Sequence, residues 1–169
     1  TQDSPKEPGD SAKPMIPKIK FGTDGWRGII ADDFTFTNVR YCAQAVAEYL
    51  RDKGLAPRGM VVGYDTRFAS ERFAAAVAEV FAGNDIKTHL CPQATPTPIV
   101  SYGVTREKAA GAVIITASHN PGQWNGFKIK SPDGSSAPTQ VEAEVESRLP
   151  QIMAQDKIKR LDLEDGLAK

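Results

Sequence analysis

Thr116 to Lys128 (TASHNPGQWNGFK) is the stretch whose residue types and spacing could do chemistry. It places Ser118 beside His119 in a segment rich in turn-forming residues. A serine hydrolase is poorly supported, because adjacent residues of an extended chain point to opposite sides and no G-x-S-x-G elbow is present. The alternative is a serine that carries phosphate, since phosphoryl transfer needs positive groups and positioning more than a strong base.

The cations that could serve such a serine are Arg27, His119 and Lys128. Gly122 and Gly126 let the loop after the serine fold tightly, so the next strand is expected to return Lys128 towards Ser118. By spacing alone, a loop that merely connects two strands and carries a surface serine is an equally open interpretation.

The segment FGTDGWRG (Phe21–Gly28) could bind an anion, because its glycines let the backbone approach and Arg27 can grip phosphate with a bidentate fork. An ordinary turn is the alternative for this pattern, and Asp24 is interpreted as a turn residue. Asp65 and Arg67 are also open to two interpretations. They could contact a ligand, or they could form a local ion pair that caps the next helix.

The elements that must position these residues follow from the apolar pattern. Spacings of three and four residues predict helices over 37–50 and 70–83, with Ser70 as the N-cap of the second. Short apolar runs predict strands over 60–64, 86–91 and 112–115. Each predicted helix is flanked by glycines or by capping residues, which supports these boundaries.

Later segments carry weaker signals. The prolines of 92–100 predict a loop that is not helical until after Pro98, followed by a short helix over 99–104. Alternation over 126–130 predicts a half-exposed strand, with Lys128 and Lys130 on its outer face. The pattern from Thr139 to Glu142 resembles a capping box, and the helix that it opens is expected to end or kink at Pro150.

Alternation of strands and helices predicts the α/β class, as a three-layer α/β/α sandwich with a mixed, mainly parallel sheet. The strand over 126–130 follows its predecessor after a short loop, so it is expected to be the one antiparallel strand. In open sheets of this class, ligands bind beyond the carboxyl ends of the parallel strands. Asp65–Arg67 and Thr116–Pro121 fall there.

Composition limits the possible partners. The chain has 169 residues, with 21 Lys and Arg against 21 Asp and Glu, so no basic field favours nucleic acid as a partner. No apolar run approaches the roughly 18 residues of a membrane helix. Cys42 and Cys91 lack metal-ligand spacing and are interpreted as small core residues, which suits a reducing, cytoplasmic compartment. His89 is expected to be partly buried rather than catalytic.

Three motifs resemble those of one enzyme family. TASHNPGQWNGFKI (Thr116–Ile129) is similar to the phosphoserine loop of the α-D-phosphohexomutases, the phosphoglucomutase/phosphomannomutase superfamily. KFGTDGWRGI (Lys20–Ile29) resembles the amino-terminal motif of that family, and VGYDTR (Val62–Arg67) fits a third stretch. The matches occur in the family's order and cover residues from about 18 to 150.

The resemblance implies an enzyme that moves phosphate between O1 and O6 of a hexose. By position, Ser118 is the phosphorylated residue, and a hexose 1,6-bisphosphate is the intermediate and activator. Lys128, His119 and Arg27 match residues around the transferring phosphoryl group, where they offset charge or assist proton transfer. Thr23 matches an active-site loop position. The hexose phosphate is thus expected to contact Thr23, Arg27, Ser118, His119 and Lys128.

In this family Mg²⁺ is bound by a phosphoserine oxygen and by three aspartates of a later D-x-D-x-D-R loop, which does not occur here. Ser118, through its phosphate, is therefore the one metal ligand that the resemblance assigns. The chain is expected to comprise a disordered leader that is no signal peptide (1–14), domain I (15–155) and a linker (156–169). The remaining domains of a longer parent chain are its expected partners, and the fragment alone is expected to lack turnover.

Two other functions are compatible with the same motifs. The phosphoglucosamine mutase branch is one, although NGFKI after the serine looks more like the glucose/mannose branch. The other is a sugar-phosphate-binding module without catalysis. The presence of Ser118, His119, Lys128 and Arg27 together argues against the module, which would not need all four.

Overall fold

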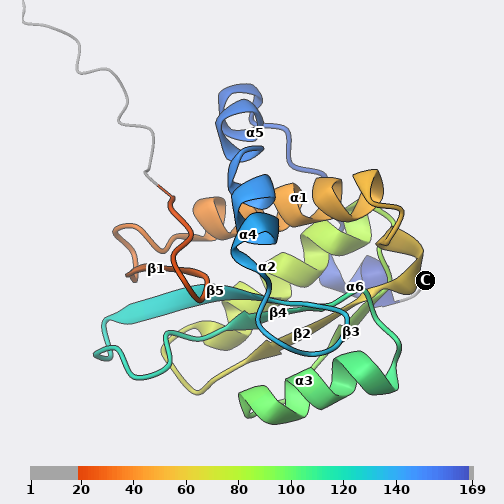
Figure 1. Cartoon of the computed structure of the whole chain (residues 1–169). Helices are drawn as coiled ribbons and strands as arrows, with labels where there is room; N and C mark the ends of the chain where they lie inside the picture. Colours follow the sequence, from red (N-terminus) through yellow and green to blue (C-terminus); the bar gives the residue numbers. More distant parts are fainter. Residues whose placement is uncertain (1–18, 168–169) are drawn as a thin grey trace, which may run out of the picture.

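The structure is a computed structural model that describes residues 19–167. Within these residues, five strands form one sheet in the order β1-β5-β4-β2-β3 (Figure 1). The strands are β1 (Trp26–Ile29), β2 (Met60–Tyr64), β3 (Thr88–Leu90), β4 (Ala112–Ile115) and β5 (Trp124–Lys130). β5 runs antiparallel to both its neighbours, whereas β2 pairs in parallel with β3 and β4. The predicted mixed sheet with one antiparallel strand is confirmed.

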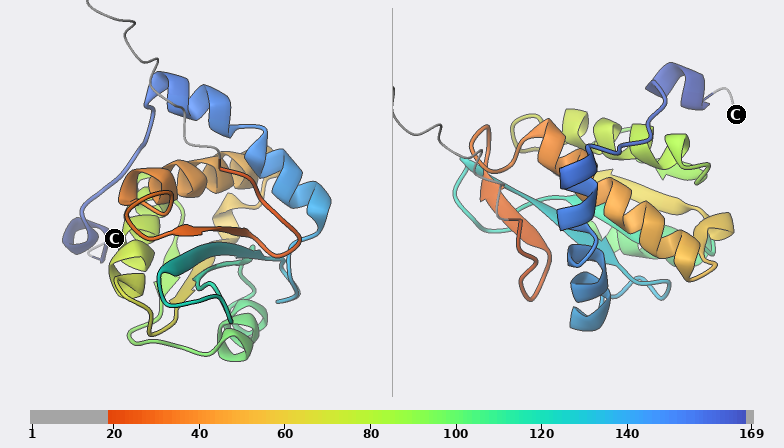
Figure 2. Two further views of the ribbon diagram at one scale, coloured as in Figure 1. Left: turned by 90° about the vertical axis from the view of Figure 1, so that its left-hand side faces the viewer. Right: turned by 90° about the horizontal axis from the view of Figure 1, so that it is seen from above.

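Helices cover both faces of this sheet (Figures 1 and 2). In chain order they are α1 (Phe36–Asp52), α2 (Ser70–Gly83), α3 (Thr97–Arg106), α4 (Thr139–Glu146), α5 (Leu149–Gln155) and α6 (Leu163–Leu167). α1 and α2 lie over one face, with α4 and α5 packed against α1, and α3 lies on the opposite face. The predicted three-layer α/β/α arrangement is therefore confirmed.

The two faces bury cores of unequal size. The larger core lies under α1 and α2, where Phe34, Val46 and Phe127 are almost completely buried. The smaller core packs α3 on the sheet through residues such as Val100 and Ile114. Burying a side chain of this size stabilises a fold by about 1.5–3 kcal/mol, so the sheet is a rigid support for the loops at its edge.

The prediction that β5 is half-exposed is wrong. Phe127 and Ile129 face the larger core as expected, but Lys128 and Lys130 on the opposite face are also buried, at 6% and 9% exposure. β5 lies inside the sheet between β1 and β4. Oxygens from neighbouring loops accept hydrogen bonds from both ammonium groups, which is what allows charged side chains to be buried there.

Helix boundaries differ from the predictions where local signals compete with tertiary contacts. Ser70 is the first residue of α2 and not its N-cap. Ala69 occupies the cap position in a left-handed conformation, with φ of 60°, and no side chain caps the helix. The Ser70 hydroxyl instead donates to the nearby Asp65 carboxylate at 2.7 Å and accepts from buried Asn125 of β5 at 2.9 Å, so a contact with the sheet has replaced the cap.

The predicted start of α3 and the predicted cap of α4 are also wrong. α3 begins at Thr97, before Pro98, because a proline in the first turn loses no helical hydrogen bond. α4 begins at Thr139 without a capping box. Its Glu142 accepts a hydrogen bond from the Gly25 amide instead, so this carboxylate holds another loop. Pro150 lies in the first turn of α5 rather than ending the preceding helix.

Neither cysteine is in a disulfide. Cys42 is fully buried in the larger core, and burial raises the pKa of its thiol far above the usual range. Cys91 is half-buried between the two cores. His89 lies in β3 and is half-buried, as predicted.

The predicted leader over 1–14 lies outside the described residues. At the other end, the backbone of Leu161 donates to the Glu79 carbonyl of α2, and that of Lys159 donates to Gln44 of α1. The linker over 156–169 stays a prediction. Across residues 19–167, none of the helices has both the length and the apolar character needed to cross a bilayer.

Candidate active site

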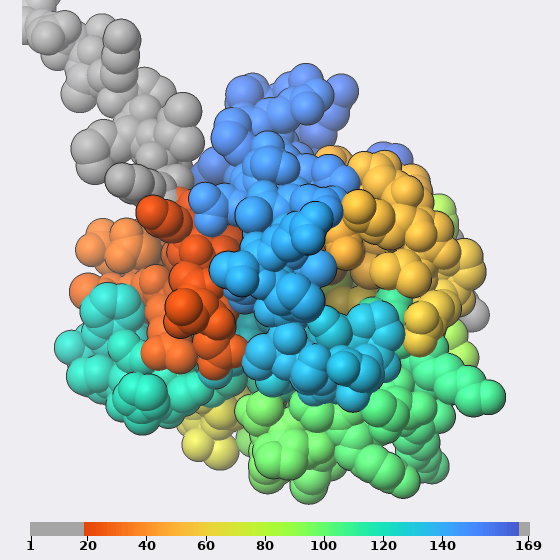
Figure 3. Space-filling view, in the orientation of Figure 1, coloured from red at the N-terminus to blue at the C-terminus, as the bar shows by residue number. Residues whose placement is uncertain are grey.

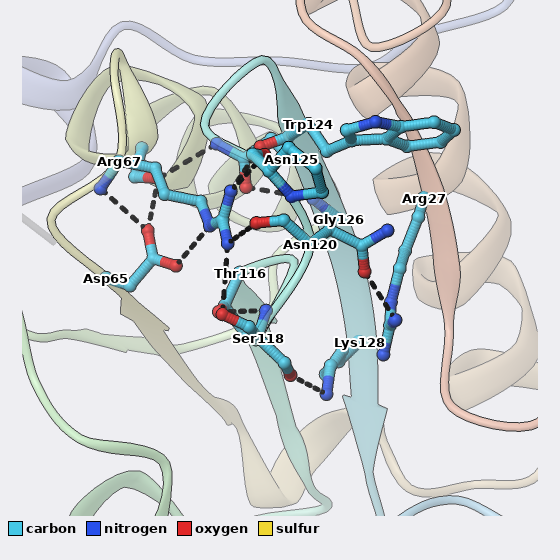
Figure 4. A network of polar contacts seen from close by, with 12 residues as sticks. Arg27, Asp65, Arg67, Thr116, Ser118, Asn120, Trp124, Asn125, Gly126 and Lys128 are labelled. Carbon is cyan, nitrogen blue, oxygen red and sulfur yellow. Dashed lines mark hydrogen bonds and ion pairs between the residues drawn. The ribbon is translucent and has the colours of Figure 1, made fainter.

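The loop between β4 and β5, residues 116–123, is called the serine loop below. Its Ser118 hydroxyl lies 2.7 Å from the Lys128 ammonium, which projects from β5 (Figure 4). The Asp24 carboxylate lies 2.5 Å from the same ammonium on its other side. The predicted return of Lys128 to Ser118 is therefore confirmed, and the lysine bridges a carboxylate and an exposed hydroxyl.

Two local features fix the conformation of the serine loop. The Thr116 hydroxyl accepts the Ser118 N–H at 3.0 Å, and Ser118 has a left-handed backbone with φ of 55°. A Cβ atom at Gly126 would lie 2.4 Å from the Thr116 carbonyl, so only glycine lets the two strands approach here. Gly122, by contrast, has open space around it, and the prediction that it is needed for a tight fold is wrong.

Arg27 reaches the serine loop from β1. Its guanidinium donates to the Asn120 side chain at 2.7 Å (Figure 4). The same group lies 3.8 Å from Asp24. Pairing of β1 with β5 sets Arg27 directly opposite Gly126. The structure thus brings this predicted cation to the site, in contact with Asn120 rather than with Ser118.

Thr23 and His119 are both exposed. His119 follows Ser118 in the turn but is not part of the hydrogen-bonded chain that joins Asp24, Lys128 and Ser118. Thr23 sits in the loop before β1, whose Gly25 has φ of 87° and would clash with the Phe127 carbonyl if it carried a Cβ. Both side chains are free to meet a ligand.

Asp24 is a site residue that the sequence interpretation missed. Burial alone would raise the pKa of its carboxyl, but the hydrogen bond and charge of Lys128, together with the charges of Lys130 and Arg27, outweigh burial and hold the pKa below its ordinary value of 3.8. The carboxylate is therefore ionised at neutral pH and offsets the buried charge of Lys128. A lone aspartate in a glycine-rich turn gave no signal of this role.

α4 supports the loop that carries Asp24. Glu142, itself buried, accepts the Gly25 N–H at 2.9 Å, and Glu146 accepts the Phe21 N–H at 2.7 Å. Burial raises the pKa of Glu142, against the opposing effect of the Gly25 hydrogen bond. Figure 3 shows how the segment from residue 19 onwards (red) lies between the serine loop (teal) and α4 (blue) on one face of the molecule.

Asp65 and Arg67, which follow β2, form an ion pair, as one of their two interpretations predicted, but no side chain caps α2 as that interpretation also expected. Arg67 Nε lies 3.2 Å from Asp65 Oδ2. The guanidinium also donates to main-chain carbonyls of the serine loop, including that of Ser118 (Figure 4). Its relation to Ser118 could not be inferred from the sequence, because main-chain contacts across the sheet leave no trace in residue types.

A hollow of about 470 Å³ opens beside Ser118. It is lined by the carboxyl ends of β2 and β4, by the serine loop and by the start of α3. Sites for small ligands typically measure about 300–1,000 Å³, and this position beyond the strand ends is where open α/β sheets bind them. Ser118 lines this hollow, whereas Lys128 and Arg27 do not line it.

The residues at this site do not by themselves form an Mg²⁺ site. Among residues 19–167, no three His, Cys, Asp or Glu side chains gather closely enough to hold a metal ion. Next to Ser118 the available carboxylate is Asp24, which is paired with Lys128. Mg²⁺ prefers near-octahedral oxygen ligands and carboxylates, so this set is incomplete.

Comparison with known proteins matches the chain to one family. Residues 18–156 match the family model described as phosphoglucomutase/phosphomannomutase, alpha/beta/alpha domain I. A phosphoglucomutase of Komagataeibacter xylinus is 32% identical over 161 residues, which cover 89% of this chain. A human glucose 1,6-bisphosphate synthase is 37% identical over 123 residues, or 66% of this chain.

Solved structures agree with this match. The crystal structure of a provisionally named phosphomannomutase from Thermus thermophilus aligns with a TM-score of 0.75 and 39% identity over 80% of this chain. This chain spans 29% of the bacterial relative, 20% of the human relative and 30% of the crystallised one. It therefore corresponds to less than a third of each of these proteins.

Proposed function

The chain belongs to the phosphoglucomutase/phosphomannomutase family, and on that premise we propose that it is the catalytic-serine domain of a phosphohexomutase. The reaction would interconvert a hexose 1-phosphate and a hexose 6-phosphate through a phosphoserine and a hexose 1,6-bisphosphate. The observation that carries the proposal is the 2.7 Å contact between the exposed Ser118 hydroxyl and the buried Lys128 ammonium. The human relative's name, glucose 1,6-bisphosphate synthase, supports a bisphosphorylated sugar as the intermediate.

In the proposed step, a sugar hydroxyl attacks the phosphorus of phosphorylated Ser118. The new P–O bond forms as the P–Oγ bond breaks, and the sugar's proton passes to a base, for which His119 is positioned in the same turn. Lys128 lies within hydrogen-bonding distance of Oγ, so it can neutralise or protonate the leaving oxygen. Asp24 keeps that ammonium in place, and Arg27 adds positive charge at the loop. Such preorganised charge is the main source of acceleration in phosphoryl transfer.

The metal and the partners belong to the same proposal. A phosphate on Ser118 would supply one oxygen to Mg²⁺, and we expect the other ligands to come from further parts of a longer parent chain. Those parts would also hold the hexose phosphate, with Thr23 contributing from this side. We propose a domain over 15–155, a linker over 156–169 and a cytoplasmic location.

Replacing Ser118 in the full-length protein tests the function. Ser118→Ala should abolish most conversion of glucose 1-phosphate or mannose 1-phosphate, and intact-mass measurement should show loss of one phosphate. The protein should still fold, with a loss of stability of no more than about 1–3 kcal/mol, because Ser118 is exposed but its hydroxyl is one of two partners of the buried Lys128 ammonium. Ser147→Ala, which removes an exposed hydroxyl on the far side of α4, is the matched control. Near-normal mutase activity in Ser118→Ala would disprove the proposal.

A further inference from the structure

Arg67 uses every hydrogen-bond donor that it has. A guanidinium carries five N–H groups. Nε faces Asp65 at 3.2 Å, and the four remaining donors meet four main-chain carbonyls (Figure 4). These carbonyls belong to Pro121 at 2.8 Å, Trp124 at 3.0 Å, Ser118 at 3.0 Å and Asn120 at 2.6 Å.

All four carbonyls come from the serine loop or from the residue that begins β5. Their oxygens, which carry the negative ends of the carbonyl dipoles, converge on one point. Without a cation between them, these oxygens would repel one another. Arg67 is the side chain that meets them, and it is 14% exposed. A planar fork with five donors can hold four oxygens at once, which a compact ammonium with three donors cannot do.

Ser118 is the residue whose geometry depends most on this contact. The Thr116 hydroxyl holds the peptide group before Ser118 through its N–H, and Arg67 holds the peptide group after it through its carbonyl. Ser118 lies between them with φ of 55°. A residue with a side chain persists in this left-handed region only where its surroundings fix it.

A second set of hydrogen bonds, centred on Asp65, anchors Arg67 to the sheet. The Asp65 carboxylate also accepts from the Arg67 N–H and from the Ser70 hydroxyl. Asn125 of β5 donates to the same hydroxyl from a fully buried position. Through the Ser70 hydroxyl, Asp65 thus links the start of α2 to the start of β5. Its carboxylate also fixes the position of the Arg67 guanidinium.

We propose that Arg67 is a positioning residue for Ser118, an assignment that rests on the function proposed above. Arg67 gathers the carbonyls of the serine loop, fixes the left-handed turn and so keeps the Ser118 oxygen next to Lys128. It is not a ligand of the substrate phosphate, because its donors are all engaged and its charge is paired with Asp65. Its substitution should therefore affect the chemical step rather than substrate binding.

The test compares Arg67→Lys with Arg58→Lys in the full-length, phosphorylated protein. Arg58 is a matched control, because its guanidinium also donates to two main-chain carbonyls, those of Lys108 and Ala109, away from the site. A misplacement of about 1 Å can cost roughly 100-fold in rate, so Arg67→Lys should lower kcat about 100-fold and change KM less than about 3-fold. Arg58→Lys should retain kcat within about 2-fold, as surface substitutions do.

A spectroscopic measurement separates positioning from general destabilisation. At fixed pH, the ³¹P resonance of phosphorylated Ser118 should be displaced from that of the urea-unfolded protein, because Lys128 lies beside it. In Arg67→Lys it should move towards the unfolded value, while Arg58→Lys keeps the wild-type position. If Arg67→Lys does not fold, Asp65→Asn should show the same displacement and loss of kcat, since it removes the charge that holds Arg67.

The possible outcomes distinguish this inference from the proposed function. If Ser118→Ala is inactive but Arg67→Lys has normal kcat and an unchanged ³¹P resonance, the positioning role is refuted and the function stands. A large rise in KM with normal kcat would refute it too, since Arg67 would then be binding the substrate. If Ser118→Ala keeps its activity, the proposed function fails whatever Arg67→Lys does.

Discussion

Lys128 is a buried cation with two different partners, a carboxylate and a hydroxyl. Lys130, one step further along the same face of β5, is also buried, but its ammonium binds the Ser136 hydroxyl at 3.1 Å. The two lysines share a strand, a face and a degree of burial. Comparing substitutions of the two lysines therefore separates the loss of a charge next to Ser118 from the general loss of a buried lysine.

Lys128→Met in the full-length protein should lower turnover by about 100-fold or more, as expected when one preorganised charge is lost from a transition state. Lys130→Met should lower it by less than about 10-fold, because Lys130 contacts neither Ser118 nor the serine loop. Steady-state mutase assays and thermal unfolding of both variants make the comparison. Equal losses of kcat at equal stability would contradict the role of Lys128.

Asp24→Asn tests the electrostatics of the same pair through pH. Since the folded state lowers the pKa of Asp24, the carboxylate contributes stability above its unfolded pKa of about 3.9, and this contribution disappears as pH falls through the lower folded value. Wild type should therefore exceed Asp24→Asn in free energy of unfolding by a constant margin from pH 7 to about 5. The margin should shrink below about pH 4. Urea unfolding across this range measures it, and a margin that persists unchanged at pH 3 would refute the ion pair.

Residue types and the family resemblance together predicted part of this site. Ser118 and Lys128 lie ten residues apart in a glycine-containing loop, and Arg27 lies in a second glycine-rich segment, but spacing alone left a plain connecting loop equally open. Asp24, Arg67 and Glu142 were not recognised, because each acts on a segment far away in the sequence. Arg67 and Glu142 bind main-chain atoms, whose positions depend on the fold rather than on residue identity.

Among the helices and strands, too, features set by local sequence were predicted better than features set by distant contacts. Strands β2 to β5, the helices between them and the reversed β5 followed from apolar periodicity and from the short β4–β5 loop, whereas β1 was not predicted. Local capping signals were less reliable. Ser70 and Glu142 both satisfy the sequence pattern of a cap but donate or accept elsewhere, since a buried tertiary partner outweighs a solvent-exposed local one.

The contact between α3 and β2 gives a prediction about packing. A Cβ atom at Gly63 would lie 2.4 Å from a methyl group of Val100, so the helix rests directly on the strand backbone. Gly63→Ala should destabilise the fold by about 1–3 kcal/mol through overpacking. Val100→Ala should relieve this, and the double variant should lose at least about 1 kcal/mol less than the sum of the single ones.

Gly103→Ala provides the control within α3. The nearest atom to a Cβ at Gly103 is 3.8 Å away, an ordinary contact, so this change should be neutral or stabilising by up to about 1 kcal/mol. Urea unfolding of all four variants completes the cycle. Additive losses for Gly63→Ala and Val100→Ala would show that the close approach of helix and strand is not what glycine permits.

At the scale of the whole molecule, a well-formed core supports a site that is open on one side. The sheet and helices bury two continuous clusters, and we expect this core to be sufficient for independent folding. Ser118, His119 and Thr23 are exposed, and a hollow opens beside Ser118. Under the proposed function, phosphoryl transfer to a sugar needs positioning of both reactants and exclusion of water, and this chain would provide the serine side of that arrangement.

We therefore predict that the 169-residue chain, expressed alone, unfolds cooperatively but does not interconvert hexose phosphates. The chain matches less than a third of each of these relatives, and the proposed reaction requires the sugar to be held in two orientations while each end in turn meets Ser118. Urea unfolding monitored by Trp fluorescence and by circular dichroism should give coincident transitions, as expected for a single domain. Incubation with glucose 1-phosphate and glucose 1,6-bisphosphate should yield no 6-phosphate above the level of the Ser118→Ala chain, with the full-length protein as the positive control. If the isolated chain shows turnover that Ser118→Ala abolishes, the exposed site is sufficient for the reaction. If the two unfolding transitions do not coincide, the core needs the rest of the parent protein.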